Sequence, residues 1–394
     1  MPRFEPFPAL RYSPSLPLAT VTAPPYDVLS ETDLDALEAQ HLRNIVHIDV
    51  PRDRDGESRY LDAATRLQTW IDEGTLVYDP RPSYTVYRMS FRDEAGRNRE
   101  ISGVLGGLEV VDEGAGGVLP HERTTPKAKT DRLDLTRATG MNLSPVWGLS
   151  LASGLTEVLR SPGDVMGSFT DPDGVTHTVE RIDDPSRVRT IGNTVSGADV
   201  VIADGHHRYA ISRTYRDERR AASGAGPWDL TLTYVNELVA DQLSVAAIHR
   251  LYTGITLDAL RQALSTSFDL EPAGAVSPTT TLAMVERGAL CLVDGSGEGT
   301  YLVPRPAAFA GVRDLDSARL EHALADTPHT VAYQHGVTNV LSMVGAGTAT
   351  AAILIRPVPV SEIRRTAHER LLMPPKSTFF TPKLKTGLVI RPVR

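Results

Sequence analysis

The chain has 394 residues, with 41 Lys and Arg against 49 Asp and Glu, and a formal net charge of −8 at pH 7. Its apolar fraction of 41% and its charged fraction of 23% are those of ordinary globular proteins, and its length predicts two or three domains. The acidic balance argues against a broad nucleic-acid interface, which needs many cations to neutralise phosphates, but it leaves room for one anion pocket.

The sequence has few features that indicate a targeting signal or redox chemistry. The single cysteine, Cys291, excludes a disulfide within the chain and argues against a cysteine-ligated zinc site, and we expect it to be a buried thiol. The N-terminal residues lack the apolar stretch of a signal peptide, and no window approaches the roughly 18 apolar residues of a membrane helix. We therefore expect a cytoplasmic protein with no membrane partner.

The first region, residues 1–114, begins with an irregular, proline-rich stretch. Ser30 followed by Asp33 is a capping-box pattern, which predicts the start of a helix. Gly74 supplies the stop signal of a second helix, whose apolar residues recur at helical spacing. The elements expected here are helices over 31–40 and 57–73, and strands over 44–50, 83–91 and 100–111.

The second region, 115–225, follows a glycine-rich break at 112–117. Its first helix is expected to have Pro126 in the first turn and Gly140 beyond the end. The turn-rich stretch 160–184 predicts a hairpin insertion. The other elements expected are strands over 145–151 and 198–203, and helices over 185–193 and 206–222.

The third region, 226–394, follows a second break of small residues at 221–227. The elements expected are strands over 231–236, 244–249, 290–293, 300–303, 351–355 and 387–393, and helices over 257–265, 315–324 and 360–371. Because strands and helices are mixed throughout the chain, the sequence predicts the α/β or α+β class.

The most informative segment is Asp204-Gly205-His206-His207-Arg208, where a strand is expected to give way to a helix. A helix N-terminus carries unpaired N–H groups and a partial positive charge, and it therefore binds phosphate. Gly205 permits a sharp turn and a close approach to a ligand. Arg208 can form paired hydrogen bonds with a phosphate, and the two histidines add donors. Asp204 could bind Mg²⁺ or accept a proton from a hydroxyl.

A structural alternative stays open for this segment. In it, Asp204 only caps the helix and Arg208 forms a surface ion pair. We favour the phosphate site, because five consecutive residues combine several phosphate-binding side chains. A zinc site built on His206 and His207 is disfavoured, because neighbours on a helix point about 100° apart and no third ligand is evident nearby.

A second helix start is expected within residues 121–132. Thr125 fits an N-cap, and Pro126 fits the first helical position. The cations of this segment are Lys127, Lys129 and Arg132. Glu122 is the best candidate for a general base if the two helix ends face each other. The alternative is a solvated, charged helix.

Two terminal motifs complete the candidates. The C-terminal stretch carries basic and hydroxyl side chains that could close over a phosphate, namely Lys376, Ser377, Thr378, Lys383 and Lys385. Pro24-Pro25-Tyr26-Asp27 predicts a rigid extended segment, from which Asp27 could reach a metal or a substrate amine. An ordered surface loop and a packing turn are the respective alternatives.

The chain resembles the family catalogued as domain of unknown function 1015 nearly end to end. The matching segments are 23–28, 43–49, 121–124, 203–209, 373–378 and 382–387. The middle third is similar to the ParB/sulfiredoxin-like fold, in which a Gly-x-His-Arg signature at a helix start holds nucleotide phosphates. Here that signature is Gly205-His206-His207-Arg208. The characterised proteins that it resembles are free serine kinases, which phosphorylate L-serine with ADP or ATP.

This resemblance implies a mixed α/β protein with a ParB/sulfiredoxin-like core. It also implies Mg²⁺-dependent transfer of a phosphoryl group from ATP or ADP to free serine or a similar small alcohol. Glu122 matches the catalytic base of these kinases, and Asp204 matches the aspartate before their Gly-His-His-Arg run. The full set of expected site residues is Glu122, Asp204 and His207 for catalysis, Thr124, Lys127, Gly205, His206, Arg208, Lys376, Ser377, Thr378 and Lys383 for the nucleotide, Asp27 and His121 for substrate or metal, and Asp204 for the metal.

Departures from those kinases leave several points open. The chain has long terminal regions and the insertion at 160–184, so neither the acceptor nor the choice of nucleotide follows from the resemblance. A non-catalytic nucleotide-binding switch and a nucleotide phosphohydrolase are the alternatives. A nucleic-acid partner is disfavoured by the net charge, and the sequence does not predict the oligomeric state.

Overall fold

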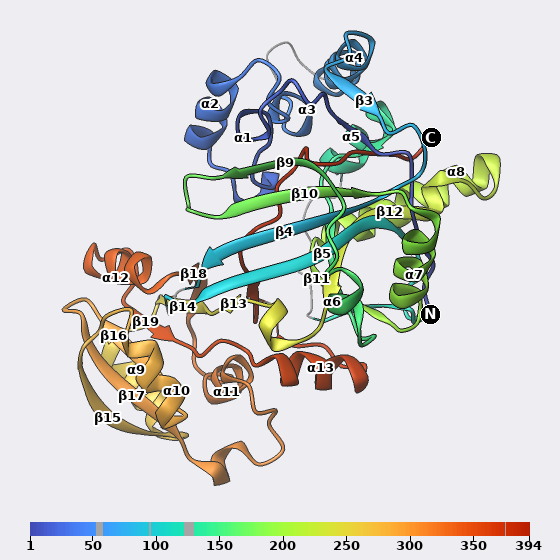
Figure 1. The fold of residues 1–394 in the computed structure, drawn as a ribbon. Coiled ribbons are helices and arrows are strands. Elements are labelled where there is room, and N and C mark those ends of the chain that lie inside the picture. Colours follow the sequence, from blue (N-terminus) through green and yellow to red (C-terminus); the bar gives the residue numbers. More distant parts are fainter. Residues whose placement is uncertain (53–57, 94–95, 122–129, 375) are drawn as a thin grey trace. The chain divides into compact units, whose positions relative to one another are not determined.

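The computed structural model describes residues 1–52, 58–93, 96–121, 130–374 and 376–394, which divide into two compact units (Figure 1). Unit 1 comprises Met1–Leu243 and Pro382–Arg394, and unit 2 comprises Ser244–Thr381. The chain therefore leaves unit 1 after Leu243 and returns to it at Pro382. These limits differ from those of the three regions expected from the sequence, 1–114, 115–225 and 226–394.

Unit 1 is built on a nine-stranded mixed sheet in the order β6-β11-β8-β12-β5-β4-β10-β9, with β1 paired to β5. Two of its pairs, β6 with β11 and β8 with β12, are parallel, and the others are antiparallel. The strands are β1 (Phe4–Glu5), β4 (Tyr84–Arg92), β5 (Asn98–Glu109), β6 (Val118–Pro120), β8 (Val146–Ser150), β9 (Asp164–Thr170), β10 (Thr176–Ile182), β11 (Val200–Asp204) and β12 (Leu230–Glu237).

Helices and two short strand pairs complete unit 1. The helices are α1 (Leu18–Val21), η1 (Tyr26–Val28), α2 (Glu31–Gln40), α3 (Val46–Asp49), α4 (Arg59–Asp72), α5 (Thr130–Thr139), α6 (Leu155–Val158), α7 (Pro185–Ser196), α8 (His206–Ser223), η2 (Pro227–Asp229) and η3 (Ala240–Gln242). The strand pairs are β2 (Leu10–Tyr12) with β3 (Leu76–Tyr78), and β7 (Met141–Asn142) with β21 (Arg391–Pro392). One apolar cluster packs on the large sheet, and another joins the N-terminal helices to Ile390.

Unit 2 contains a six-stranded antiparallel sheet in the order β15-β17-β16-β19-β14-β18. The strands of unit 2, inside and outside this sheet, are β13 (Val245–Ala246), β14 (Ile248–Thr253), β15 (Phe268–Ala275), β16 (Leu290–Asp294), β17 (Glu298–Pro304), β18 (Thr330–His335), β19 (Ala351–Leu354) and β20 (Phe379–Phe380). Its helices are α9 (Leu257–Ser265), α10 (Thr280–Arg287), η4 (Pro306–Phe309), α11 (Asp316–Ala323), α12 (Val337–Gly345) and α13 (Val360–His368). Cys291 is a buried free thiol, as expected.

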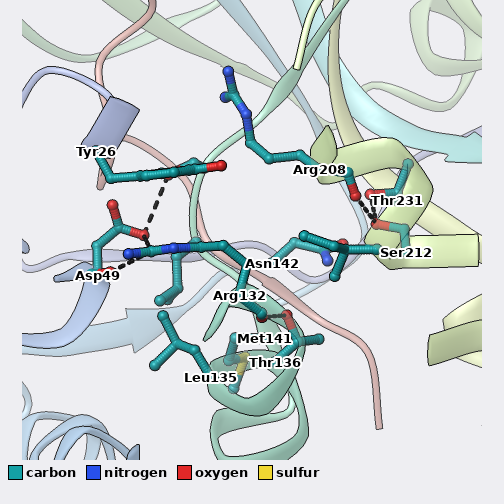
Figure 2. Close-up of a pocket in the computed structure, with 13 residues that line it drawn as sticks. Tyr26, Asp49, Arg132, Leu135, Thr136, Met141, Asn142, Arg208, Ser212 and Thr231 are labelled. Atoms are coloured by element: carbon teal, nitrogen blue, oxygen red, sulfur yellow. Dashed lines mark hydrogen bonds and ion pairs between the residues drawn. The ribbon is translucent and has the colours of Figure 1, made fainter. Parts of the chain in front are cut away.

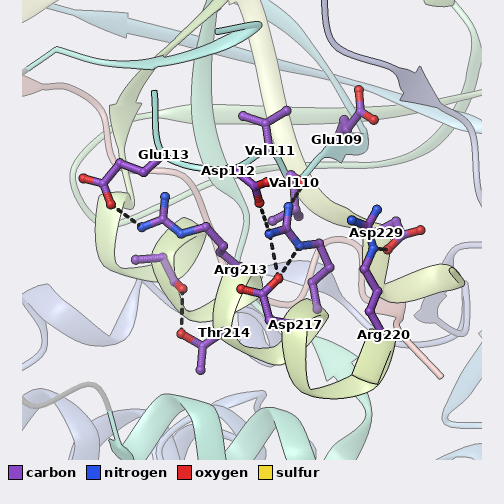
Figure 3. A network of polar contacts seen from close by, with 12 residues as sticks. Glu109, Val110, Val111, Asp112, Glu113, Arg213, Thr214, Asp217, Arg220 and Asp229 are labelled. Carbon is purple, nitrogen blue, oxygen red and sulfur yellow. Dashed lines mark hydrogen bonds and ion pairs between the residues drawn. The ribbon is translucent and has the colours of Figure 1, made fainter. Parts of the chain in front are cut away.

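Residues 213–220 of helix α8 contact the chain that follows β5, and also η2 (Figure 3). Arg216, whose side chain is buried, donates to the carbonyl oxygen of Val110 and pairs with Asp112. Two further ion pairs on the same helix are Arg213–Glu113 (3.0 Å) and Arg220–Asp229 (2.7 Å). These contacts fix the axis of α8, and with it the position of its first turn.

The mixed α/β class expected from the sequence is confirmed. Ser30 and Asp33 form the predicted capping box at the start of α2. The stretch 160–184 holds the β9–β10 hairpin, as predicted. Among the described residues, every helix is too short or too polar to cross a bilayer.

Three element predictions are wrong. The segment 44–50 was expected to be a strand, but it contains α3, because the Asn44 side chain accepts a hydrogen bond from the N–H of Val46 and starts a turn there. The strand over 244–249 is divided into β13 and β14, and the strand over 387–393 is reduced to β21 and a bridge between Ile390 and Leu10. Elements that were not predicted include β15, α10, β18 and α12.

A buried ion pair supports the N-terminal part of unit 1 and yields a stability prediction. Asp79 accepts hydrogen bonds from Arg11 at 2.9 Å and from the Ser83 hydroxyl at 2.6 Å, and the Arg11 and Asp79 side chains are each 5% exposed. Asp79→Asn leaves the guanidinium buried without its counter-ion, which should cost about 3 kcal/mol.

Thermal unfolding of the two-unit protein measures this effect. The control is Glu271→Gln, which breaks the exposed Arg287–Glu271 pair of unit 2 and should change stability by less than about 0.5 kcal/mol. Equal effects of the two substitutions would contradict the role given to the buried pair.

Candidate functional site

The candidate site lies where two parallel strands end side by side. Strand β11 pairs with β6 in the register Ile202 to Pro120, so Asp204 and His121 lie at the carboxyl ends of neighbouring strands. The His121 and His206 rings are 5.0 Å apart, centroid to centroid. The pairing of β6 with β11 thus places His121 beside the first turn of α8.

Gly205 forms the turn between β11 and α8. Its φ of +84° lies in the left-handed region, and the N–H of Tyr209 donates to its carbonyl oxygen at 2.9 Å. As the N-cap residue, Gly205 has no side chain to bond the first N–H groups of α8. The two carboxylate oxygens of Asp204, the preceding residue, each face a cation. The capping alternative for Asp204 stays open.

Those two cations are far from each other in the sequence. Asp204 Oδ2 accepts a hydrogen bond from Arg208 Nη2 at 2.8 Å, and Asp204 Oδ1 lies 3.2 Å from Lys383 Nζ. Burial alone would raise the pKa of Asp204, but Lys383 and Arg208 hold it well below its ordinary value. Such a carboxylate stays ionised, which suits it to hold cations rather than to take up a proton.

Arg208 is held in place on several sides. It donates to the carbonyl oxygen of Pro145 as well as to Asp204, and its side chain is 9% exposed. Burial lowers its pKa, but Asp204 and then Asp27 raise it above its ordinary value. Its Nε has no hydrogen-bond partner among the described residues and lies over Gly205, where an added Cβ would be 3.0 Å away. Gly205 thus makes room for the guanidinium.

The two histidines at the strand ends are neutral near pH 7. Burial lowers the pKa of His121 to about 4, and burial together with the neighbouring His121 lowers that of His206 to about 3. His121 Nδ1 lies 2.5 Å from the carbonyl oxygen of Ile202, so it is the protonated nitrogen of that ring. In the part of the chain that the structure describes, His206 Nε2 is buried without a hydrogen-bond partner.

A small pocket of about 50 Å³ lies beside Arg208 (Figure 2). Asp49, at the end of α3, is 3% exposed and accepts hydrogen bonds from Arg132 at 3.2 Å and from the Ser144 hydroxyl at 3.3 Å. The Arg132 guanidinium lies 3.9 Å from the centre of the Tyr26 ring. The other lining residues are Leu135, Thr136, Met141, Asn142, Leu143, Ile211, Ser212 and Thr231.

Burial dominates the electrostatics of Asp49. It raises the pKa of the carboxyl above its ordinary value, although Arg132 and Arg208 act in the opposite direction. The pocket therefore presents both an acidic group and basic groups to a small polar molecule. The lining residue Arg208 also binds Asp204, so the pocket and the start of α8 share one side chain.

The structure brings only some of the expected site residues together. Asp204, Gly205, His206, Arg208, His121 and Lys383 gather at the start of α8. His207 is the second residue of α8 and is partly buried. Asp27 is exposed in η1, next to Tyr26, and contributes to the electrostatics of Arg208. Glu122, Thr124 and Lys127 lie outside the described residues, as do Thr125, Pro126 and Lys129.

The basic C-terminal stretch is divided between the units. Lys383 and Lys385 belong to unit 1, whereas Lys376, Ser377 and Thr378 belong to unit 2. Ser377 is buried and donates to the carbonyl oxygen of Pro374 at 2.7 Å, and Lys376 is exposed. The roles expected for the three unit 2 residues stay predictions.

Most residues of the pocket were not among the expected site residues, including Tyr26, Asp49 and Ser144. An acid directly after the mostly apolar stretch 45–48 was the available signal for Asp49, but the strand predicted there hid its position. Among the described residues, no three His, Cys, Asp or Glu side chains gather to hold a metal ion.

Comparisons with known proteins give one family and several distant structures. The family model described as "Protein of unknown function (DUF1015)" matches residues 4–318. Solved structures that the comparison found include a free serine kinase in complex with AMP (12% identity, TM-score 0.37, covering 69% of this chain and 89% of that one). SbnI with a C-terminal truncation from Staphylococcus aureus is 12% identical, with a TM-score of 0.39 and coverage of 73% and 87%.

A conserved hypothetical protein from Pyrococcus furiosus is 11% identical, with a TM-score of 0.37, and the match covers 69% of this chain and 92% of that one. No curated protein matches the chain. At these identities and scores, the roles of individual residues have to be argued from the site itself.

The geometry of Gly205 gives a prediction that links backbone and site. Gly205→Ala adds a Cβ that is 3.0 Å from Arg208 Nε at a left-handed φ, and so it should cost about 1–3 kcal/mol and displace the guanidinium. Gly154→Ala is the matched control, because Gly154 is also a left-handed N-cap residue but has no atom within 4 Å of the added Cβ.

Differential scanning calorimetry compares the stability of the two variants, and a titration with ADP compares their affinity. We expect only Gly205→Ala to weaken anion binding. A Gly154→Ala variant that loses as much affinity would disprove the link between the turn and Arg208.

The buried neutral histidines predict an acid-sensitive stability. The folded-state pKa of His121 is about 4, below the ordinary value, so the unfolded chain takes up a proton first as the pH falls. The stabilisation is complete above about pH 6.5 and decreases toward the folded pKa, by about 2 kcal/mol at pH 5.

The measurement is the unfolding temperature at about pH 7.5 and about pH 5. In His121→Asn, whose amide can still donate to Ile202, the decrease should be smaller than in the unmodified protein. The same decrease in both proteins would show that His121 is not buried in the neutral form.

Proposed function

The chain belongs to the family described as "Protein of unknown function (DUF1015)", and we propose that its unit 1 is a phosphotransferase that uses a nucleotide. In this proposal the start of α8 binds the phosphates of ATP or ADP. A small hydroxyl compound, with free serine as the first choice, accepts the phosphoryl group. Phosphoryl transfer relies mostly on positioning and on stabilisation of charge, and the groups at this site can supply both.

The observation that carries the proposal is the start of α8, where two cations lie beside the turn at Gly205. Gly205, which precedes the first N–H groups of α8, has no side chain to cap them. Arg208 and Lys383 converge on one point at the same turn, although they are 175 residues apart in the sequence (383 − 208). A helix start with added cations is a binding site for phosphate groups.

Asp204 fits a role in cation binding. It is ionised, and in the described structure it already holds two positively charged groups. With a nucleotide present, Asp204 and the phosphate oxygens would together hold Mg²⁺, which prefers oxygen ligands and neutralises the charge on phosphates. Lys383 and Arg208 would then turn part of their hydrogen bonding from Asp204 to the phosphates.

The pocket beside Arg208 fits the acceptor. Its volume is about 50 Å³, and its polar groups include Asp49, Ser144 and Arg132. A compound with a hydroxyl and both charged and polar groups would find partners there. The choice of serine comes from the resemblance of the motifs. The base role of Glu122 rests on that resemblance and on its place beside the second expected helix start, and the catalytic role of His207 stays a prediction from the sequence.

Mass spectrometry of reaction products tests this function. Purified protein is incubated with Mg²⁺, with ATP or ADP, and with a panel of free amino acids and small alcohols. Asp204→Asn should lower product formation about 100-fold or more, because it removes the charge that organises the cations. Asp217→Asn is the control and should keep full activity, because the Asp217 side chain is exposed and its partner Arg216 keeps its contacts with Asp112 and the Val110 carbonyl oxygen.

Two other outcomes would replace this proposal. Nucleotide binding without a phosphorylated product would indicate a nucleotide-dependent switch. Release of inorganic phosphate that is independent of any acceptor would indicate a hydrolase. If Asp204→Asn and Asp217→Asn had equal effects, the site would have to be sought elsewhere.

A further inference from the structure

Two lysines in the returning C-terminal segment reach two different acids of unit 1. Lys383 Nζ lies 3.2 Å from Asp204 Oδ1, and Lys385 Nζ lies 2.7 Å from Asp171 Oδ2. Directly after them, Thr386 exchanges two backbone hydrogen bonds with Ala23, at 2.8 and 3.2 Å. The Thr386 hydroxyl also bonds that of Ser144 at 3.0 Å, so the stretch 383–386 contacts the pocket as well as the start of α8.

Asp171 is the end of a buried polar chain. His177 Nε2 lies 3.0 Å from Asp171 Oδ2, and His177 Nδ1 lies 2.7 Å from the Tyr87 hydroxyl. Burial would raise the pKa of Asp171, but Lys385 and His177 lower it, so the carboxylate is ionised and can only accept. His177 Nε2 therefore donates to Asp171, and His177 Nδ1 accepts from the Tyr87 hydroxyl.

The second oxygen of Asp171 is used within the β9–β10 hairpin. Asp171 Oδ1 accepts the N–H groups of Asp173 at 3.1 Å and Val175 at 3.0 Å, which closes the turn of the hairpin. Every part of this carboxylate is thus fixed by the hairpin and by His177. Its charge is balanced by Lys385, whose side chain is only 11% exposed. A buried carboxylate requires such a partner.

We propose that Lys385 is a positioning residue, which binds Asp171 at the tip of the β9–β10 hairpin and so holds Lys383 against Asp204 in the nucleotide site. The expected effect of Lys385 on nucleotide binding rests on the proposed function, whereas its effect on the position of Lys383 does not. It gives the hairpin at 160–184 a role, namely to supply the anchor for the segment that returns from unit 2.

The placement of Lys383 can be measured without any nucleotide. Amine acetylation of the full chain, followed by peptide mass spectrometry, compares Lys383 with the exposed Lys376 as an internal reference. Lys383 is 17% exposed and ion-paired, so it should react several-fold more slowly than Lys376. In Lys385→Met it should react at least about threefold faster than before, and Lys385→Arg, which keeps a cation, should restore protection.

The matched control is Glu180→Gln. Glu180 belongs to the same hairpin and forms an ion pair with Arg88 at 3.0 Å. Its other hydrogen-bond partner among the described residues is the N–H of Gly163, which also lies outside the C-terminal segment. Its loss should therefore destabilise the hairpin without exposing Lys383. Continued protection of Lys383 in Lys385→Met, or equal exposure in Glu180→Gln, would overturn the inference.

A double-mutant cycle with MgADP as the ligand tests the consequence for binding. Lys383→Met and Lys385→Met should each weaken binding at least about tenfold, and the double variant should bind no more weakly than Lys383→Met alone. If the double variant lost affinity by the product of the two single losses, Lys385 would act on binding independently of Lys383. If the unmodified protein does not bind MgADP, the proposed function fails, and the acetylation result alone then decides whether Lys385 positions Lys383.

Discussion

The carboxylate of Asp204 is the point on which the candidate site depends. It lies at the end of β11 and binds Arg208 from the first turn of α8 and Lys383 from the C-terminal segment. Both cations are largely buried, and without an acid between them they would repel each other. Because Asp204 stays ionised, it keeps two positive groups beside the start of α8. In the proposed function, these groups are in place before the phosphates of a nucleotide arrive.

The ion pair between Lys383 and Asp204 depends on the return of the chain to unit 1. Unit 2 is inserted between Leu243 and Pro382, and the last residues then cross unit 1 through contacts with Ala23, Leu10 and β7. Arg391 adds to this attachment by donating to the carbonyl oxygens of Leu230 and Pro227. The returning segment is therefore part of the fold of unit 1, and it carries Lys383 as one element of the site.

Local sequence patterns were sufficient to predict the strand, the turn and the helix at Gly205, but not the residues from elsewhere in the chain that contact them. The order of strand, Gly205 and helix was predictable, because each step depends on neighbouring residues, and α8 begins at His206 as expected. The pairing of Lys383 with Asp204 joins residues 179 positions apart, and no local pattern encodes it. Asp49 was missed because a short apolar run does not distinguish a strand from a helix, and the Asn44 side chain decided in favour of α3.

The central claim is that the start of α8 binds phosphate groups. The most direct measurement follows the backbone amide NMR signals of Gly205, His206 and His207 during a titration with MgADP, with adenosine as the control. The account predicts a saturable change of these signals with MgADP and no change with adenosine, because the phosphates are the groups that bind. Unchanged signals in this turn, or equal changes with adenosine, would contradict it.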